Sequence, residues 1–424
     1  VASVVVDLGF GDAGKGLLTD YLVRSTEADC VVRFNGGAQA GHNVIDSNGR
    51  HHTFSQFGSG SFVAGVRTHL ARPVVVHPTA LRVEAERLAR IGVTDAFARL
   101  TVDPECLVTT PFQQAAGRLR ELQRAEARHG SCGVGVGETV QDALESPELS
   151  LRFADLSHPA RARDRLLSLR ARKAREFEAL SQQQLSPALE REYSALLDPQ
   201  LPDRWLSAAA QIARCVRMVR DEDLKTRSDS LVFEGAQGVL LDERFGFHPH
   251  TTFSRCGFDG ALDLLANLGF SGDVRRIGVL RSYMVRHGPG PLPTEDERVS
   301  AQTVELHNEM GPWQKHVRKG WPDFVLLDYA LRASGGVDEV ALTHLDALRA
   351  FPQYPCCLAY EGAPLALPNG IAEQETLTRR LFAASPEYHT IPASRFCDLL
   401  EAECRVKVGW VSTGPRASDV SRRA

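Results

Sequence analysis

Short apolar segments alternate along this chain with longer stretches of helical periodicity. Residues 3–8 form a nearly continuous apolar run that ends in glycines, as in a strand that is buried on both faces of a parallel sheet. Helical periodicity follows from Gly16 through Leu22 and beyond. This alternation predicts an α/β fold with a mostly parallel central sheet wrapped by helices.

The same pattern continues to the end of the chain. Further elements are predicted as strands at residues 31–34, 73–76, 230–233, 276–280 and 339–342, and as a helix at residues 79–91. Residues 158–226 are rich in Ala, Leu, Arg, Glu and Gln, which predicts several amphipathic helices. They could form a coiled-coil surface for a partner, but no heptad is sustained, which favours a packed helical subdomain. We therefore expect one domain over residues 1–424 that carries a helical insertion at about 158–226.

Composition narrows the class of protein. The 424 residues include 49 Lys and Arg against 53 Asp and Glu, and 43% are hydrophobic. This is a globular composition, and the net charge of −4 argues against a general nucleic-acid binder. No apolar run reaches 18 residues, so no membrane span is expected, and the N-terminus is typical of a strand and not of a signal peptide. Nine cysteines without CxxC spacing argue against a zinc site or a disulfide framework and favour a reducing cytoplasm.

A glycine-rich loop follows the first predicted strand. Residues 9–16, Gly-Phe-Gly-Asp-Ala-Gly-Lys-Gly, match the pattern GxxxxGK between a strand and a helix. Backbone N–H groups and the helix N-terminus can approach phosphate oxygens there, and Lys15 adds a positive charge. However, Gly16 stands where a hydroxyl residue is usual, and Asp12 would repel phosphate unless a metal or a proton offsets it. Asp12 is thus a candidate metal ligand, base or both, although a turn without a ligand stays open on this loop alone.

Seven segments together resemble the adenylosuccinate synthetase family, in the family's order. They are residues 11–16 (family GDEGKG), 33–43 (RxxGGxNAGH), 233–242 (FEGAQGxLLD), 286–295 (RxGxGPFPTE), 320–323 (GWxD), 342–346 (LTKLD) and 412–415 (STGP). They span the whole chain, so we identify the chain as resembling a divergent member of this family.

The resemblance implies both a fold and an activity. Members are homodimers with a P-loop-like, mostly parallel sheet, and they ligate IMP and L-aspartate with GTP and Mg²⁺ in purine (AMP) biosynthesis. The 6-oxygen of IMP is phosphorylated, and the amino group of aspartate then displaces the phosphate. Asp12 would take the proton from N1 of the purine and bind Mg²⁺ together with the carbonyl of Gly41. His42 would act as the acid at the 6-oxygen, Lys15 would contact the phosphates, and Gln237 would contact the purine.

The resemblance also implies the remaining binding residues. For GTP they are Gly11, Gly14, Lys15, Gly16, Gly41, His42, Thr343, His344, Asp346, Ser412, Thr413 and Gly414. For IMP they are Asp12, Asn35, Gln39, Ser131, Cys132, Gln237 and Thr252, of which Thr252 would hold the nucleotide phosphate. For aspartate they are Lys315, His316 and Arg318. The carboxylate of Asp346 matches the two adjacent N–H donors of guanine, which explains its place in the GTP site.

The chain departs from the family at several anion-binding positions. The family's TTGRGxGP segment is Ser131–Glu138 here, with Val134 in place of Arg, and Leu149 replaces the Arg that reaches the partner subunit, with Arg152 nearby. In the aspartate loop His316 and Val317 replace two Arg residues. Each lost bidentate contact costs about 1.5–3 kcal/mol in binding free energy.

Smaller departures lie around the nucleotide. Ala13 replaces a Glu, Gly9 a Gln and His344 a Lys. A related ligase with another acceptor or amine, and a catalytically silent nucleotide-binding protein, therefore remain alternatives. The retained Asp12 and His42 argue against the silent protein. A related phage enzyme that acts on dGMP lacks the Asp that is kept here as Asp12, which argues against that variant.

Overall fold

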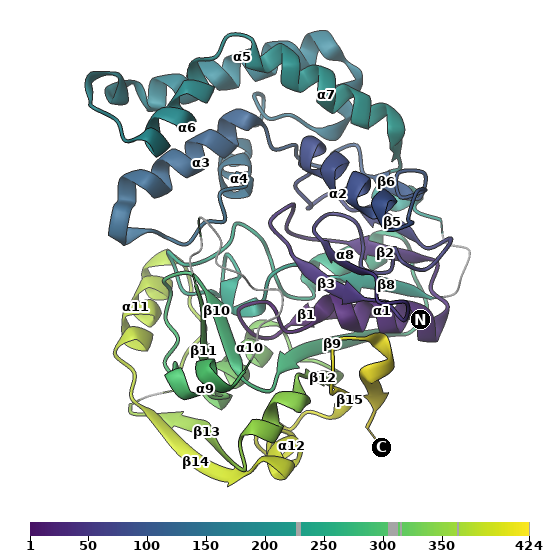
Figure 1. Ribbon diagram of the computed structural model, residues 1–424, viewed down its shortest axis with the longest axis vertical. Helices are drawn as coiled ribbons and strands as arrows, with labels where there is room; N and C mark the ends of the chain where they lie inside the picture. Colours follow the sequence, from purple (N-terminus) through teal and green to yellow (C-terminus); the bar gives the residue numbers. More distant parts are fainter. Residues whose placement is uncertain (226–229, 304–312, 314–315, 363, 424) are drawn as a thin grey trace.

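A mostly parallel sheet forms the centre of the molecule (Figure 1). The computed structural model describes residues 1–225, 230–303, 313, 316–362 and 364–423. Ten strands lie in the order β16-β15-β12-β9-β1-β8-β2-β5-β6-β7, and each neighbouring pair is parallel except β15 and β16. β1 (Ala2–Asp7) is buried at every position and lies between β8 (Leu231–Glu234) and β9 (Val274–Arg281). The predicted fold class is confirmed.

The other strands fall into the same sheet and three antiparallel ribbons. The sheet also contains β2 (Cys30–Arg33), β5 (Arg67–Leu70), β6 (Leu100–Val102), β7 (Arg217–Met218), β12 (Glu339–Thr343), β15 (Val408–Ser412) and β16 (Val420–Arg422). The ribbons pair β3 (His42–Ile45) with β4 (His51–Phe54), β10 (Met284–His287) with β11 (Val317–Gly320), and β13 (Gln353–Tyr360) with β14 (Pro386–Pro392).

Helices surround the sheet. They are α1 (Lys15–Thr26), α2 (Pro78–Arg90), α3 (Pro111–Arg124), α4 (Val136–Glu145), α5 (Pro159–Glu176), α6 (Pro187–Leu197), α7 (Leu201–Cys215), α8 (Asp259–Asn267), α9 (Glu297–Gln302), α10 (Phe324–Ala333), α11 (Ile371–Phe382) and α12 (Phe396–Cys404). Short 3₁₀ turns span Ala125–Ala127, Phe153–Ser157, Glu178–Gln182, Asp221–Asp223, Val239–Leu241, Leu345–Ala350, Ala393–Arg395 and Ala417–Asp419. Among the described residues, no helix combines the length and the apolar character that crossing a membrane requires.

The helices α5, α6 and α7 gather with α3 and α4 at the end of the molecule away from the β13–β14 ribbon (Figure 1). Their apolar side chains share one core with β5, β6 and α2, so they pack on an edge of the sheet. Lys173 of α5 is 2% exposed and lies 2.7 Å from Asp142 and 3.1 Å from Glu138, both on α4. This buried ion cluster ties α4 to the helical layer. The division into domains stays a prediction.

Two expected boundaries are wrong. Residues 73–76 are not a strand of the sheet, because the chain turns at Ala71, where Val74 N–H donates to its carbonyl, and then continues beyond the strand ends. Val75 and Val76 form only isolated bridges there, with Gly37 and Val108. The expected helical stretch of residues 158–226 also ends early: β7 lies within it and adds to the sheet edge beside β6. A short apolar run can form a buried connecting segment as well as a strand.

Candidate active site

Two glycine-rich loops meet at the carboxyl ends of adjacent strands. One follows β1, and the other follows β8. A Cβ on Gly238 would lie 2.2 Å from the carbonyl oxygen of Gly9, so only glycine permits this contact. The N–H of Leu240 donates to the same carbonyl at 3.1 Å. The contact places Gln237 beside the loop that carries Asp12.

The first loop wraps around a buried carboxylate. Asp7, the last residue of β1, accepts hydrogen bonds from the backbone N–H groups of Gly9 at 2.8 Å and Ala13 at 3.0 Å. Lys15 Nζ lies 3.0 Å from Asp7 Oδ2, and both side chains are buried. The carboxylate therefore shapes the loop and holds the Lys15 ammonium. Asp7 is not among the residues expected from the sequence, although a charged residue at the end of an apolar strand is a signal for such a role.

The start of α1 explains the missing hydroxyl of the GxxxxGK pattern. Gly11 and Gly14 have φ of 95° and 94°, a region that suits glycine, and Gly14 precedes the helix without a side-chain cap. A Cβ on Gly16 would lie 2.9 Å from the Cβ of His42 and 3.2 Å from its carbonyl carbon. A Ser or Thr at position 16 would collide with β3. The glycine thus allows α1 to approach His42 closely.

His42 is held by a buried glutamate. Its Nδ1 lies 2.6 Å from Oε1 of Glu234, and Oε2 of the same carboxylate accepts the N–H of Ser59 at 3.0 Å. Burial lowers the pKa of His42, which the Glu234 carboxylate opposes, and the charges of Arg33 and Lys15 lower it further. The geometry assigns the Nδ1 proton to the bond with Glu234 and leaves Nε2 as the free edge of the ring. Glu234 lies in a segment that the sequence analysis singled out, but its orienting role appears only in three dimensions.

Three amide atoms of Gln39 and Gln237 are buried close to Gly36 and Gly37 without a hydrogen-bond partner. Oε1 of Gln237 is buried and has no hydrogen-bond partner, and the same is true of both amide atoms of Gln39. A Cβ on Gly36 would lie 3.0 Å from Oε1 of Gln237, and one on Gly37 would lie 3.0 Å from Oε1 of Gln39. Buried polar atoms nearly always have partners. A ligand with several polar atoms, such as a purine nucleotide, would satisfy them.

Two other expected IMP residues have mainly backbone partners. Nδ2 of Asn35 donates to the carbonyls of Ala236 at 3.1 Å and Arg255 at 2.8 Å, and its oxygen accepts the N–H of Ala236 at 2.6 Å. Asn35 therefore joins two loops of the site. Thr252 is half-buried, and its N–H donates to the carbonyl of Leu241 at 2.8 Å.

The segment with Ser131 and Cys132 packs close to β10. A Cβ on Gly130 would lie 2.9 Å from Cδ of Pro289, just beyond the end of β10. The carboxylate of Glu121 accepts the N–H groups of Gly130 at 3.1 Å and Ser131 at 3.3 Å. Ser131 is exposed and Cys132 is half-buried. The segment is thus near the site, but a carboxylate already occupies two of its N–H groups.

The end of β12 joins the first loop. Thr343 Oγ1 donates to the carbonyl of Ala13 at 2.7 Å and lies 2.8 Å from Nδ1 of His344. Arg281 Nη2 lies 2.7 Å from Nε2 of His344. Burial, and then the charge of Arg281, hold the pKa of His344 well below its ordinary value. The imidazole is therefore neutral and is part of a hydrogen-bonded chain that reaches the loop.

The remaining residues expected for GTP follow β12 and β15, which are neighbours in the sheet. Asp346 is exposed in the 3₁₀ turn Leu345–Ala350. Ser412 is buried and donates to the carbonyl of Gly414 at 2.7 Å, while Thr413 is exposed. These groups therefore lie at the same edge of the sheet as the first loop.

Asp12 fits the role of a magnesium ligand. Its side chain is 28% exposed, and its Oδ2 lies 2.8 Å from Nε2 of His287. Burial raises the pKa of Asp12, but the hydrogen bond and charge of His287, with Arg281 and Lys15, outweigh this and lower it to about 2. The carboxylate is therefore ionised at neutral pH. Gly41 is exposed directly before β3. No group of three or more His, Cys, Asp or Glu suited to a metal occurs in the described part of the chain. A carboxylate and a carbonyl oxygen are the types of ligand that Mg²⁺ prefers.

Comparison with known proteins decides the family. The model of the family described as "Adenylosuccinate synthetase" matches residues 4–421. The chain belongs to the adenylosuccinate synthetase family. Members of this family are ligases that form a C–N bond.

Individual relatives agree over nearly the full length. The adenylosuccinate synthetases of Neisseria gonorrhoeae and Bordetella petrii are each 30% identical to this chain, and each match covers 97% of this chain and 96% of the relative. The fully ligated adenylosuccinate synthetase of Plasmodium falciparum has the same fold, with a TM-score of 0.77, 19% identity and coverage of 100% and 99%. Cyanophage S-2L succinoaminodeoxyadenylate synthetase, solved with dGMP and dATP, is less similar, with a TM-score of 0.58, 18% identity and coverage of 99% and 95%.

The anion-binding departures from the adenylosuccinate synthetase pattern are visible in the structure. Val134 is half-buried between two glycines, and Leu149 is also half-buried. The Arg152 side chain is 36% exposed, and its Nε lies 3.3 Å from the Glu105 carboxylate while Nη1 donates to the Glu105 carbonyl at 2.9 Å. In this arrangement the Arg152 guanidinium is bound within its own chain.

The expected aspartate-binding residues are only partly described. Lys315 lies outside the described residues, and His316 is exposed. Arg318 Nη1 lies 2.7 Å from Oε2 of Glu295, Nε donates to the carbonyl of Gly288 at 3.2 Å, and Nη2 has a further carbonyl partner. In this arrangement Arg318 holds the loop after β10 instead of presenting a free guanidinium to a carboxylate.

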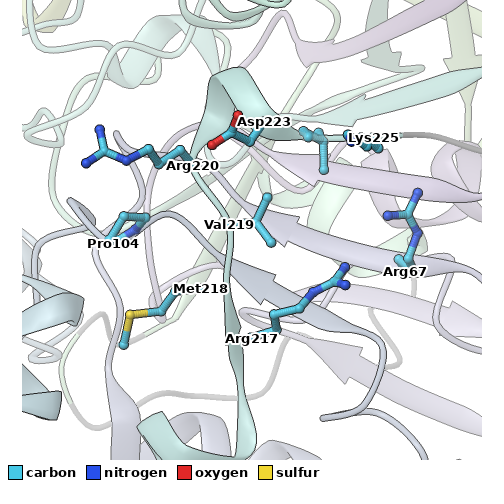
Figure 2. A pocket seen from close by; sticks show the side chains of 9 residues that line it. Arg67, Pro104, Arg217, Met218, Val219, Arg220, Asp223 and Lys225 are labelled. Atoms are coloured by element: carbon cyan, nitrogen blue, oxygen red, sulfur yellow. The ribbon is translucent and has the colours of Figure 1, made fainter.

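A hollow elsewhere contains none of the expected residues. It measures about 480 Å³ and lies at the β7 edge of the sheet, where Figure 2 shows Arg67, Arg217 and Lys225 around it. Arg67 Nη2 is already bound to Asp29 at 2.8 Å. The candidate active site is therefore the meeting point of the loops after β1, β8 and β12 and not this hollow.

Proposed function

We propose that this protein ligates IMP and L-aspartate with GTP, through a 6-phosphoryl-IMP intermediate, in purine (AMP) biosynthesis. The observation that carries this proposal is the junction of the loops after β1 and β8, which brings the Asp12 loop beside Gln237. The unpartnered amides of Gln39 and Gln237 offer polar contacts to a purine nucleotide.

We assign a separate role in the reaction to each residue of the site. The ionised carboxylate of Asp12 accepts the N1 proton of the purine while electron density moves to the 6-oxygen. The Glu234 carboxylate orients His42 so that Nε2 faces the 6-oxygen. Lys15, whose ammonium lies 3.0 Å from the Asp7 carboxylate, supplies positive charge to the phosphates. Bound Mg²⁺, held by Asp12 and the carbonyl of Gly41, would neutralise charge on the transferred phosphoryl group.

Finer features of the protein rest on the family and the sequence. We propose Asp346 as the residue that selects guanine, a homodimer as the assembly and the cytoplasm as the location. The missing Arg at position 149 removes one cross-subunit contact that family members use, so the dimer would need other contacts here. The relatives are named adenylosuccinate synthetase, which does not favour a ligase with another acceptor or a catalytically silent protein.

The test is a reconstituted reaction. Purified protein is mixed with IMP, L-aspartate, GTP and Mg²⁺, and phosphate release and the ultraviolet spectrum of the purine are followed. We expect phosphate release that requires all four components. Reactions that omit one component, and a reaction with ATP in place of GTP, serve as controls. No turnover with IMP, but turnover with another purine nucleotide or amine, would contradict the proposal.

A further inference from the structure

The catalytic carboxylate has a histidine partner that the family pattern does not assign. Nε2 of His287 lies 2.8 Å from Oδ2 of Asp12. The two side chains are 25% and 28% exposed, so the pair borders open space. His287 stands at a position that the pattern RxGxGPFPTE leaves unspecified, and the resemblance gives it no role.

The fold fixes both members of this pair. His287 is the last residue of β10 and pairs with Val317 of β11. The preceding Arg286 is 1% exposed, and its guanidinium carbon lies 4.1 Å from the ring centroid of Phe10, two residues before Asp12. The strand that carries His287 is thus packed directly against the loop that carries Asp12.

The other positive groups near Asp12 are bound to other partners. Lys15 Nζ lies 3.0 Å from Asp7, and Arg281 Nη2 lies 2.7 Å from His344. The hydrogen bond from His287 therefore has the geometry to restrain rotation of the Asp12 carboxylate. It uses one lone pair of Oδ2, so that Oδ1 is left to face the purine and the second lone pair of Oδ2 is left for Mg²⁺.

We propose that His287 is a positioning residue that holds Oδ2 of Asp12 and so directs Oδ1 toward N1 of the purine. The inference rests on the proposed function, because it needs Asp12 to act as the base. Catalytic geometry is sensitive, and a misplacement of about 1 Å can cost about 100-fold in rate. Loss of the histidine bond should therefore reduce kcat more than it changes substrate binding.

The experiment compares two replacements of similar size. In His287→Gln the amide nitrogen can still donate near the place of Nε2, while His287→Leu has no donor. We expect His287→Leu to lower kcat about 10- to 100-fold, with KM for IMP and GTP within about threefold, and His287→Gln to retain kcat within about fivefold. His389→Leu, at an exposed position of β14, is the matched control and should leave both constants unchanged.

Crystal structures of the wild type and both variants provide a readout that does not depend on activity. We expect the Asp12 carboxylate to contact residue 287 in the wild type and in His287→Gln, and to rotate away in His287→Leu. Equal kcat in His287→Leu and wild type, or an unmoved Asp12 in His287→Leu, would overturn the inference. If His287→Leu does not fold, His287→Asn, whose amide is too short to reach, takes its place.

The structures also separate the two proposals. If the wild type fails to turn over IMP, aspartate and GTP, the proposed function is wrong. The orientation of Asp12 in the three crystal structures then still decides whether His287 positions it.

Discussion

The glycine at position 16 allows a quantitative prediction, because a side chain there would press on His42, the proposed acid. In Gly16→Ala the new Cβ would lie 2.9 Å from the Cβ of His42 and 3.1 Å from the carbonyl oxygen of Asn43. Overpacking of this kind costs about 1–3 kcal/mol in the free energy of unfolding. Alanine regains up to about 1 kcal/mol through its better helix propensity, so we expect a net loss of about 0–2 kcal/mol.

The matched control is Gly260→Ala. Gly260 is the second residue of α8, as Gly16 is the second residue of α1, but its Cβ would make only ordinary contacts, the nearest at 3.5 Å from Phe34. We expect this control to gain stability of up to about 1 kcal/mol. The difference between the two variants isolates the steric cost at position 16.

Urea unfolding and steady-state kinetics are the assays. Because the strain falls on His42, kcat of Gly16→Ala should drop about tenfold or more while the protein remains folded. Gly16→Ser should have a kcat and a stability no higher than those of Gly16→Ala, although it restores the hydroxyl of the GxxxxGK pattern. Equal stability changes at positions 16 and 260, together with wild-type kcat in Gly16→Ala, would refute this reasoning.

Three further variants test separate parts of the molecule. Asp12→Asn should abolish phosphate release while the protein remains folded, because an amide cannot accept the N1 proton; near-wild-type turnover would rule out Asp12 as the base. Lys173→Met should lose about 3–5 kcal/mol in urea unfolding, since it removes the buried cation 2.7 Å from the Asp142 carboxylate and leaves only the more distant Arg172, at 3.9 Å, and a loss below about 1 kcal/mol would contradict this. Burial raises the pKa of Asp323 to about 6, although the Tyr360 hydroxyl opposes this. The folded state therefore keeps a proton that the unfolded chain releases near pH 3.8. As the pH rises from about 4 to 6, the free energy of unfolding of the wild type should fall by about 3 kcal/mol relative to that of Asp323→Asn. Parallel stability curves for these two proteins would refute the shifted pKa.

Local sequence signals were enough for much of the fold. The apolar run of residues 3–8 is a central strand, and helices occupy most of residues 158–215, because periodicity reflects which faces are buried. The apolar residues 73–76 were wrongly predicted to form a strand, because a short buried segment outside the strands can have the same apolar composition as a strand. The order of the motifs identified the family because this signal is also local. Each motif carries its own loop geometry, so a match needs no knowledge of contacts between motifs.

Contacts between distant segments were beyond the reach of those signals. The pairing of Asp12 with His287 joins residues 275 positions apart, and the pairing of His42 with Glu234 joins residues 192 apart. Arg318 seemed free to bind a carboxylate, but in the folded chain it holds Glu295. Residue type states what a side chain can bind, whereas packing of the sheet, its ribbons and its loops selects the partner that it does bind.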